Sequence, residues 1–235
     1  MSYFAVLEYA KEGNLHDYLS TEDLNWSQKL KISKDIASGL EYLHNNIEII
    51  HQNLSTETIF INNGIAQLSN PVFSELNVDI SSSISLQGGM IAFMDSELLK
   101  DPSTKFTSAS DVYSLGFVMW SISSGKLPFE NFTNQIDLAN RIVSKNIREN
   151  PVYGTPQAYI DLYQRCWGSN PEERPSAQEV YTQLEVMAQE SLKINEINPF
   201  RDIKAYSNCP KFSDYTQKVC YVALACYINM LGWDL

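Results

Sequence analysis

One segment constrains the fold of this chain more than any other: residues 111–125, which read DVYSLGFVMWSISSG. Apolar side chains cover most faces of a helix with this sequence, which is typical of a helix at the centre of a core. Gly125 is a typical helix end, because glycine adopts the left-handed conformation without a side-chain clash. The chain has 235 residues, of which 44% are hydrophobic, enough to bury a sizeable core around such a helix.

Helical periodicity recurs on both sides of this segment. Residues 27–45 place apolar side chains near a helical spacing, and Ser27 is the expected N-cap. The apolar positions are Leu30, Ile32, Ile36, Leu40 and Leu43. Further helices are expected at residues 15–19, 135–146, 156–166 and 176–194. The sequence therefore predicts a mainly helical body.

Short apolar runs predict a small strand content. Residues 3–10, YFAVLEYA, indicate a buried strand. Further short strands are expected at residues 49–50, 58–62 and 66–68. Asn62-Asn63-Gly64 separates the last two runs and is a hairpin turn signal. The polar, serine-rich stretch 75–88 predicts a flexible loop.

The net charge and the spacing of the histidines and cysteines argue against several classes of function. The formal net charge is −11, which leaves no overall basic surface for nucleic acid or an anionic membrane. No metal site is expected, because neither the histidines nor the cysteines have a metal-ligand spacing. These residues are His16, His44, His51, Cys166, Cys209, Cys220 and Cys226. The first residues lack a secretory pattern, so we expect a cytoplasmic protein with reduced cysteines.

Residues 191–235 differ in character from the body of the chain. Their apolar end, residues 219–233, is shorter than the roughly 18–20 residues that a membrane span needs. We therefore favour a packed tail, a poorly ordered tail or an interaction segment over a membrane anchor. A reading frame that runs past its true end is a third alternative.

Four blocks of sequence resemble the C-terminal lobe of a protein kinase of the tyrosine-kinase-like group. HQNLSTETIFI (51–61) resembles the catalytic loop, whose usual form is HRDLxxxN. GMIAFMDSELL (89–99) resembles the segment that ends in A-P-E. The blocks at 110–129 and 159–180 resemble later helices, including a Cys-Trp pair and an Arg-Pro pair. The four blocks occur in the family's order and at about its spacing, which makes the series far more specific than any single block.

The resemblance implies a fold class and a domain organisation. The expected fold is mainly α (α+β): a kinase-like C-terminal lobe built as a helical bundle with short β-hairpins. Residues 1–190 would form this lobe, with the N-terminal lobe absent apart from a strand that precedes the hinge. Residues 191–235 would form a divergent tail.

The resemblance also implies structural roles for individual residues. Asp111 corresponds to an aspartate that holds the backbone of the catalytic loop. Glu97 corresponds to a glutamate that pairs with the arginine matched by Arg174. Gly116 and Trp167 match scaffold positions, and His51 is expected to pack in the turn of the catalytic loop.

The same resemblance places other residues where the kinase reaction needs its chemical groups. That reaction needs phosphate-binding donors, a lysine, carboxylate-held magnesium and a carboxylate that orients the attacking hydroxyl. The substituted positions are Gln52 for arginine, Asn53 for the catalytic aspartate, Ser55 for a basic residue, Thr58 for the metal-binding asparagine and Asn70 for the D-F-G aspartate. The sequence contains no G-x-G-x-x-G and no V-A-I-K, so a nucleotide could contact only the hinge-like residues Glu8, Tyr9 and Ala10.

Three hypotheses follow from these substitutions. In the first, the chain is an inactive pseudokinase that binds or scaffolds protein partners in signalling, an active kinase being one such partner. In the second, it is an active ATP-dependent kinase whose N-terminal lobe is missing from this sequence. In the third, it is a non-functional truncated gene product. We expect no cofactor in the first and third cases, and ATP with magnesium only in the second.

Overall fold

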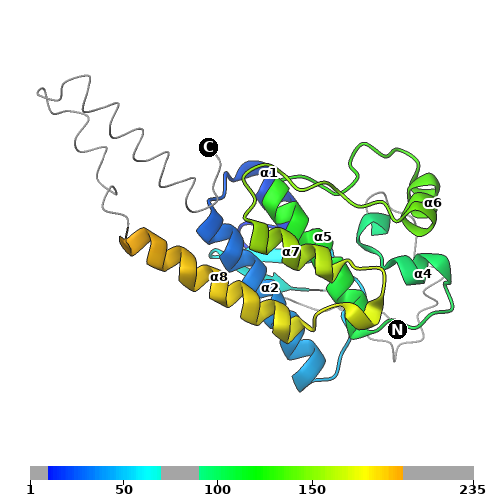
Figure 1. Ribbon diagram of the computed structural model, residues 1–235, viewed down its shortest axis with the longest axis horizontal. Helices are drawn as coiled ribbons and strands as arrows, with labels where there is room; N and C mark the ends of the chain where they lie inside the picture. Colours follow the sequence, from blue (N-terminus) through cyan, green and yellow to red (C-terminus); the bar gives the residue numbers. More distant parts are fainter. Residues whose placement is uncertain (1–9, 70–89, 198–235) are drawn as a thin grey trace, which may run out of the picture. The chain divides into compact units, whose positions relative to one another are not determined.

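A computed structural model describes residues 10–69 and 90–197 of the chain, with side chains to residue 191 (Figure 1). Several expectations lie outside the described residues. These are the strand at 3–9, the hinge-like Glu8 and Tyr9, the D-F-G position Asn70, the serine-rich loop at 75–88 and the apolar end at 219–233. The chain divides into two compact units, residues 1–188 and 189–235, and the account below concerns the first.

The predicted central helix is α5, Ser108–Ser124. Every residue from Ser110 to Ser123 is buried, so the helix is surrounded by protein on all faces. Gly125 ends it with φ 69° and donates its N–H to the carbonyl oxygen of Ser121 at 2.8 Å. The sequence prediction for this element is confirmed, because a helix of such composition is stable only when other elements cover every face.

Two long helices pack on α5: α2, Trp26–Asn46, and α7, Gln157–Cys166. The predicted cap at Ser27 is wrong. Asn25 caps α2 instead, since its side chain accepts the N–H of Gln28 while the Gln28 side chain accepts the N–H of Asn25. A reciprocal capping box of this kind satisfies two helix-end N–H groups that have no partner inside the helix.

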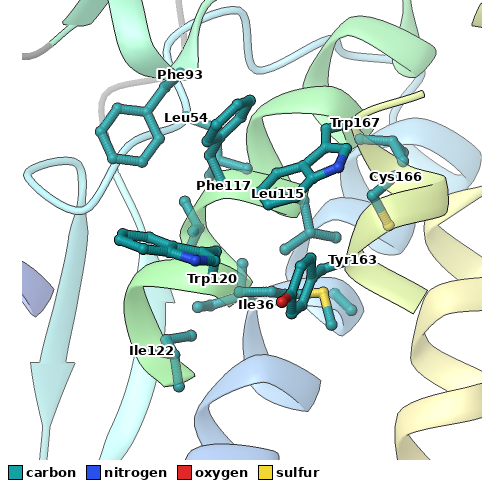
Figure 2. Packing of buried hydrophobic residues seen from close by; sticks show 14 of the residues in the cluster. Ile36, Leu54, Phe93, Leu115, Phe117, Trp120, Ile122, Tyr163, Cys166 and Trp167 are labelled. Atoms are coloured by element: carbon teal, nitrogen blue, oxygen red, sulfur yellow. The ribbon is translucent and has the colours of Figure 1, made fainter. Parts of the chain in front are cut away.

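The contact between α5 and α7 depends on Gly116. A Cβ atom at this position would lie 2.9 Å from the carbonyl oxygen of Tyr163 and 3.0 Å from the backbone nitrogen of Trp167. Only a glycine lets the two backbones approach so closely. Figure 2 shows the aromatic packing beside this contact, where the ring centroids of Phe117 and Trp167 are 4.6 Å apart and those of Tyr163 and Trp167 are 4.9 Å apart.

A two-stranded antiparallel sheet packs against α2. It consists of β1, Ile59–Asn62, and β2, Ile65–Leu68, joined at the predicted turn by Asn63 and Gly64, both with positive φ. Ile59 and Ile61 point into the core with no exposed surface. The short strand predicted at 49–50 is not formed, because the N–H of Ile49 bonds to the carbonyl oxygen of Leu43 and closes the end of α2.

The remaining elements complete a mainly helical fold with one small sheet among the described residues. They are α1 (Leu15–Thr21), η2 (Met90–Phe93), α4 (Ser96–Lys100), α6 (Gln135–Lys145), η3 (Pro171–Glu173) and α8 (Ala177–Ile197). The sequence predicted α1, α6, α7 and α8 to within a few residues of their ends. It did not predict η2, α4 and η3, which are too short for a helical period to show. None of the described helices combines the length and the apolar character that a membrane span requires.

Candidate functional site

The loop at residues 51–58 connects the end of α2 to β1, and its backbone is held by a buried carboxylate of α5. Asp111 is 1% exposed. Its Oδ2 accepts the N–H of His51 at 2.7 Å, and its Oδ1 accepts the N–H of Gln52 at 2.8 Å. Gln52 has φ 63°, a left-handed conformation that is costly for a residue with a side chain. The two hydrogen bonds stabilise this conformation at the start of the loop.

The same carboxylate has a third partner, which the sequence did not predict. Nε2 of His44, in the last turn of α2, lies 2.8 Å from Oδ2 of Asp111, and the His44 side chain is 8% exposed. A single histidine on a helix carries no pattern that marks it as part of a site. Only the packing of α2 against α5 brings His44 and Asp111 together.

His51 is fully buried and packs within the turn of the loop. Its Nδ1 accepts the N–H of Asn53 at 3.3 Å. Burial lowers the pKa of the imidazole below its ordinary value, and the negative charge of Asp111 opposes this shift only in part. A depressed pKa favours the neutral imidazole, which is the form that can accept the Asn53 hydrogen bond.

Thr58 closes the other end of the loop with hydrogen bonds inside it. Its hydroxyl donates to the carbonyl oxygen of Asn53 at 2.7 Å and accepts the N–H of Ser55 at 3.0 Å. Thr58 is 8% exposed and Ser55 is 5% exposed. Both hydroxyl groups are therefore buried in the structure of the loop itself.

A small cavity lies beside the loop. Its volume is about 30 Å³, roughly the space of one water molecule. The walls are Gln52, Asn53, Leu54 and Ser55 from the loop, Phe93, Met94, Asp95 and Leu98 around η2 and α4, and Phe106, Ser110, Asp111 and Ser114 at the start of α5. Uncharged residues of the loop therefore share this cavity with both apolar residues and the buried carboxylates Asp95 and Asp111.

The expected pairing of Glu97 with Arg174 is wrong. Arg174 instead forms a bidentate ion pair with Asp95, with distances of 2.6 Å from Nη1 to Oδ2 and 2.9 Å from Nη2 to Oδ1. Both side chains are almost fully buried. The Glu97 side chain is 40% exposed and lies 3.9 Å from Lys100. Asp95 precedes α4 as its N-cap and faces inward, whereas Glu97 lies in the first turn.

The guanidinium of Arg174 also satisfies backbone groups around the start of α5. It donates to the carbonyl oxygens of Gly168 at 2.8 Å and Ala109 at 2.9 Å. Its centre lies 4.9 Å from the ring centroid of Tyr113. Arg174 therefore fastens the segment before α4 to α5 and to the loop after α7.

The other predicted site residues have separate surroundings. Gly116 and Trp167 belong to the packed contact of α5 with α7. Ala10 is half-buried and begins the described part of the chain. In the two described ranges, no group of three or more His, Cys, Asp or Glu side chains is arranged to hold a metal ion.

The sequence matches the family described as protein tyrosine and serine/threonine kinase over residues 1–184. It is 33% identical over 193 residues to human receptor-interacting serine/threonine-protein kinase 1, covering 74% of this chain and 28% of that protein. It is 31% identical over 183 residues to cyclic GMP-binding protein C of Dictyostelium discoideum, covering 73% of this chain and 7% of that protein. It is 29% identical over 190 residues to serine/threonine/tyrosine-protein kinase HT1 of Arabidopsis thaliana, covering 78% and 47%.

These matches extend over most of the first compact unit, although the chain spans less than half the length of each of the three relatives. The order of the described elements, the loop fastened to α5 and the hairpin that follows it lie within the matched residues. The chain therefore belongs to the protein tyrosine and serine/threonine kinase family, with the mainly helical fold of a kinase C-terminal lobe.

Proposed function

We propose that this chain is a kinase-like binding module without phosphotransferase activity. The observation that carries the proposal is the chemistry of the loop at 51–58, where Asn53 and Thr58 replace the groups that a kinase uses for catalysis and for metal binding. The backbone of the loop is held by hydrogen bonds to Asp111 and Thr58, so the loop has a defined structure with these residues in place.

Asn53 cannot serve as the base of a phosphoryl transfer. A carboxylate at this position would orient the attacking hydroxyl and accept its proton, whereas an amide accepts a hydrogen bond and does not take up a proton at neutral pH. General acid–base groups contribute roughly 10²–10⁴-fold in rate. The absence of this group alone supports a rate far below that of an active kinase.

Thr58 is a poor ligand for magnesium for two reasons. Mg²⁺ prefers carboxylate or other hard oxygen ligands in an octahedral arrangement. The Thr58 hydroxyl is uncharged, is buried and already bonds to Asn53 and Ser55 within the loop. A metal ion would have to break these bonds before it could use the oxygen. Asn70, the other substituted metal position, lies outside the described residues.

The retained scaffold supports a binding role in place of catalysis. Asp111 holds the start of the loop, and Arg174 with Asp95 holds the segment opposite it. Groups that are buried and fully hydrogen-bonded keep a surface rigid, and a rigid surface loses little conformational entropy when a protein partner binds. We therefore propose a protein as the partner class.

An active kinase is the second candidate, because several relatives are named as protein kinases. One experiment separates the two. The chain would be incubated with labelled ATP, Mg²⁺ and generic peptide and protein substrates, alone and fused to the sequence that precedes Met1 in its gene. We expect no transfer above the enzyme-free background. Turnover that Asn53→Ala abolishes would show an active kinase.

A matched variant makes a negative result informative. Asn53→Asp combined with Thr58→Asn and Asn70→Asp returns the kinase residues to the three positions.

A second experiment follows the thermal unfolding of the chain at millimolar ATP with and without Mg²⁺. Because a ligand stabilises a protein according to its concentration relative to its Kd, we expect no shift for the parent chain. A magnesium-dependent rise in Tm would contradict the proposed loss of the metal site.

A further inference from the structure

The loop at residues 146–156 connects the end of α6 to the start of α7 and contains neither helix nor strand. Five consecutive residues of this loop, 150–154, are exposed. Tyr153 is 78% exposed, the largest exposed fraction among the large hydrophobic side chains of the described residues. A phenol group therefore stands in solvent on a segment without regular secondary structure.

A β-turn holds Tyr153 in this position. The N–H of Thr155 donates to the carbonyl oxygen of Val152 at 3.1 Å, and Gly154 has φ 83°. A type II turn needs a positive φ at its third residue, which glycine adopts without a clash. The indole Nε1 of Trp26 fastens the turn to α2, since it donates to the carbonyl oxygen of Gly154 at 3.0 Å. Tyr153 is the second residue of the turn and lies at its tip.

Opening this turn breaks few interactions. An enzyme that modifies the phenol must draw the backbone around it into its own active site, which breaks the hydrogen bonds of Thr155 with Val152 and of Trp26 with Gly154. A hydrogen bond in a protein typically shifts an equilibrium about fivefold, so the loss of these two disfavours the open turn about 25-fold. Such a local opening is far more frequent than unfolding of the whole unit.

Tyr42 shows how much exposure alone provides. It is 55% exposed, but it lies in α2 between Leu40, which is fully buried, and Leu43, which packs against the core. Opening the backbone here unwinds the end of α2 and takes both leucines out of the core. Burial of one leucine side chain shifts the equilibrium about tenfold or more. Tyr42 is therefore open to water but closed to the active site of another enzyme.

From this contrast we propose that Tyr153 is a phosphorylation site for a protein-tyrosine kinase that acts on this chain. The phenol oxygen attacks the γ-phosphorus of ATP, the bond from that phosphorus to the β-phosphate oxygen breaks, and ADP leaves. The phenol proton passes to the catalytic base of the modifying kinase. The inference does not depend on the function proposed above, because the modifying kinase is a second protein.

The position of Tyr153 lets the fold accept the modification. A phosphate group adds a charge of about −1.5 to −2, which at this exposed tip stays in water. The neighbouring Tyr159 and Tyr163, in α7, have no exposed surface. A phosphate on either of them would place an unpaired charge in the core, which is very costly.

The test compares Tyr153 with Tyr42 in the full chain. The chain would be incubated with ATP, Mg²⁺ and a purified protein-tyrosine kinase, and mass spectrometry would follow phosphate incorporation at each site. Synthetic peptides of residues 147–158 and 36–48 show how well the enzyme uses each sequence without the fold, and the enzyme chosen is one that phosphorylates both. Dividing the rate in the chain by the rate in the peptide isolates the effect of the fold.

We expect this ratio to be at least tenfold higher for Tyr153 than for Tyr42. Tyr153→Phe provides the control for the site, because the tryptic peptide of residues 149–165 also contains Tyr159 and Tyr163. This variant should remove the phosphate from that peptide. Equal ratios for Tyr153 and Tyr42 would overturn the proposal, as would phosphate that persists on the peptide in Tyr153→Phe or that appears only after urea unfolds the chain.

Discussion

Asp95 and Glu97 are two residues apart, yet only Asp95 reaches the guanidinium of Arg174. Asp95 is the N-cap of α4, so its backbone is not helical (φ −55°, ψ 133°), and its buried side chain also accepts the N–H of Glu97. Glu97 is already helical and lies beside Lys100 near solvent. At the residue scale, the cap of a five-residue helix therefore decides which of two carboxylates forms the buried ion pair.

The two carboxylates should differ sharply in their contribution to stability. Asp95→Ala leaves the Arg174 guanidinium buried without its carboxylate, which typically costs about 3–5 kcal/mol of unfolding free energy. Glu97→Ala removes a half-exposed charge and should cost less than about 1 kcal/mol. Urea unfolding of both variants measures the difference. Equal losses would contradict the prediction that Asp95 contributes more than Glu97 through its ion pair with Arg174.

His51 should make stability dependent on pH. Burial lowers its pKa in the folded chain, whereas the unfolded value is about 6.5. Below that value the unfolded chain binds a proton that the folded chain still excludes, so the free energy of unfolding falls as the pH drops. For one proton the slope is at most about 1.4 kcal/mol per pH unit.

Urea unfolding between pH 7.5 and 5 checks this slope, with His51→Gln as the control because glutamine does not titrate. Subtracting the control removes the contributions of the other titrating groups. A parent and a variant with parallel pH profiles would contradict the prediction.

At the scale of elements, the fold depends on how closely α5 and α7 approach each other. Gly116 provides the space, and the cluster of Phe117, Tyr163 and Trp167 packs around the contact (Figure 2). Gly39 holds a comparable place between α2 and β2, but the atoms nearest to a Cβ there belong to the side chain of Leu68. A side-chain end can move, whereas the backbone of α7 cannot move without disturbing the helix.

Replacing each of these two glycines by alanine should show how the loss of stability differs between a Cβ that meets backbone atoms and a Cβ that meets a side chain. Gly116→Ala places a Cβ 2.9 Å from a carbonyl oxygen of α7 and should destabilise the chain by about 1–3 kcal/mol, as overpacking does. Gly39→Ala meets only the end of Leu68 and gains roughly 0.5–1 kcal/mol of helix propensity, so its effect should be small. Thermal unfolding of both variants tests the contrast, and a larger loss for Gly39→Ala would contradict it.

At the scale of the whole first unit, one hydrophobic core surrounds α5 and extends to α1, the hairpin and the start of α8. Cys166 lies within it at the end of α7, with no exposed surface. Burial raises the pKa of its thiol to about 12. Because the thiolate is the reactive form, the folded chain protects this cysteine both by excluding reagent and by suppressing ionisation.

Labelling of Cys166 should therefore report global unfolding. In a background of Cys209→Ser, Cys220→Ser and Cys226→Ser, we expect a thiol reagent at pH 8 to modify Cys166 only as fast as the unit unfolds. The labelling rate should rise with urea in parallel with the loss of helical circular dichroism. Rapid labelling without urea would show that the core around α7 opens locally.

The sequence by itself determined the large features of this protein. Apolar side chains cover most faces of the helix at residues 111–125, which is typical of a helix at the centre of a core, and the turn Asn63-Gly64 selects a hairpin through residues that tolerate positive φ. The residue identities of the loop at 51–58 are also read directly from the sequence, since chemical identity does not depend on fold, and their replacement of catalytic groups stays a prediction.

Only the tertiary structure decided which side chains meet. Nothing in the chain marks Asp95 over Glu97 for Arg174, or His44 for Asp111, because these pairs are 79 and 67 residues apart. Hydrophobic periodicity also does not report single hydrogen bonds. Such bonds make Asn25 the cap of α2 in place of Ser27, and they join Ile49 to the end of α2. Periodicity reports which face of an element is buried, and packing alone sets the partners on that face.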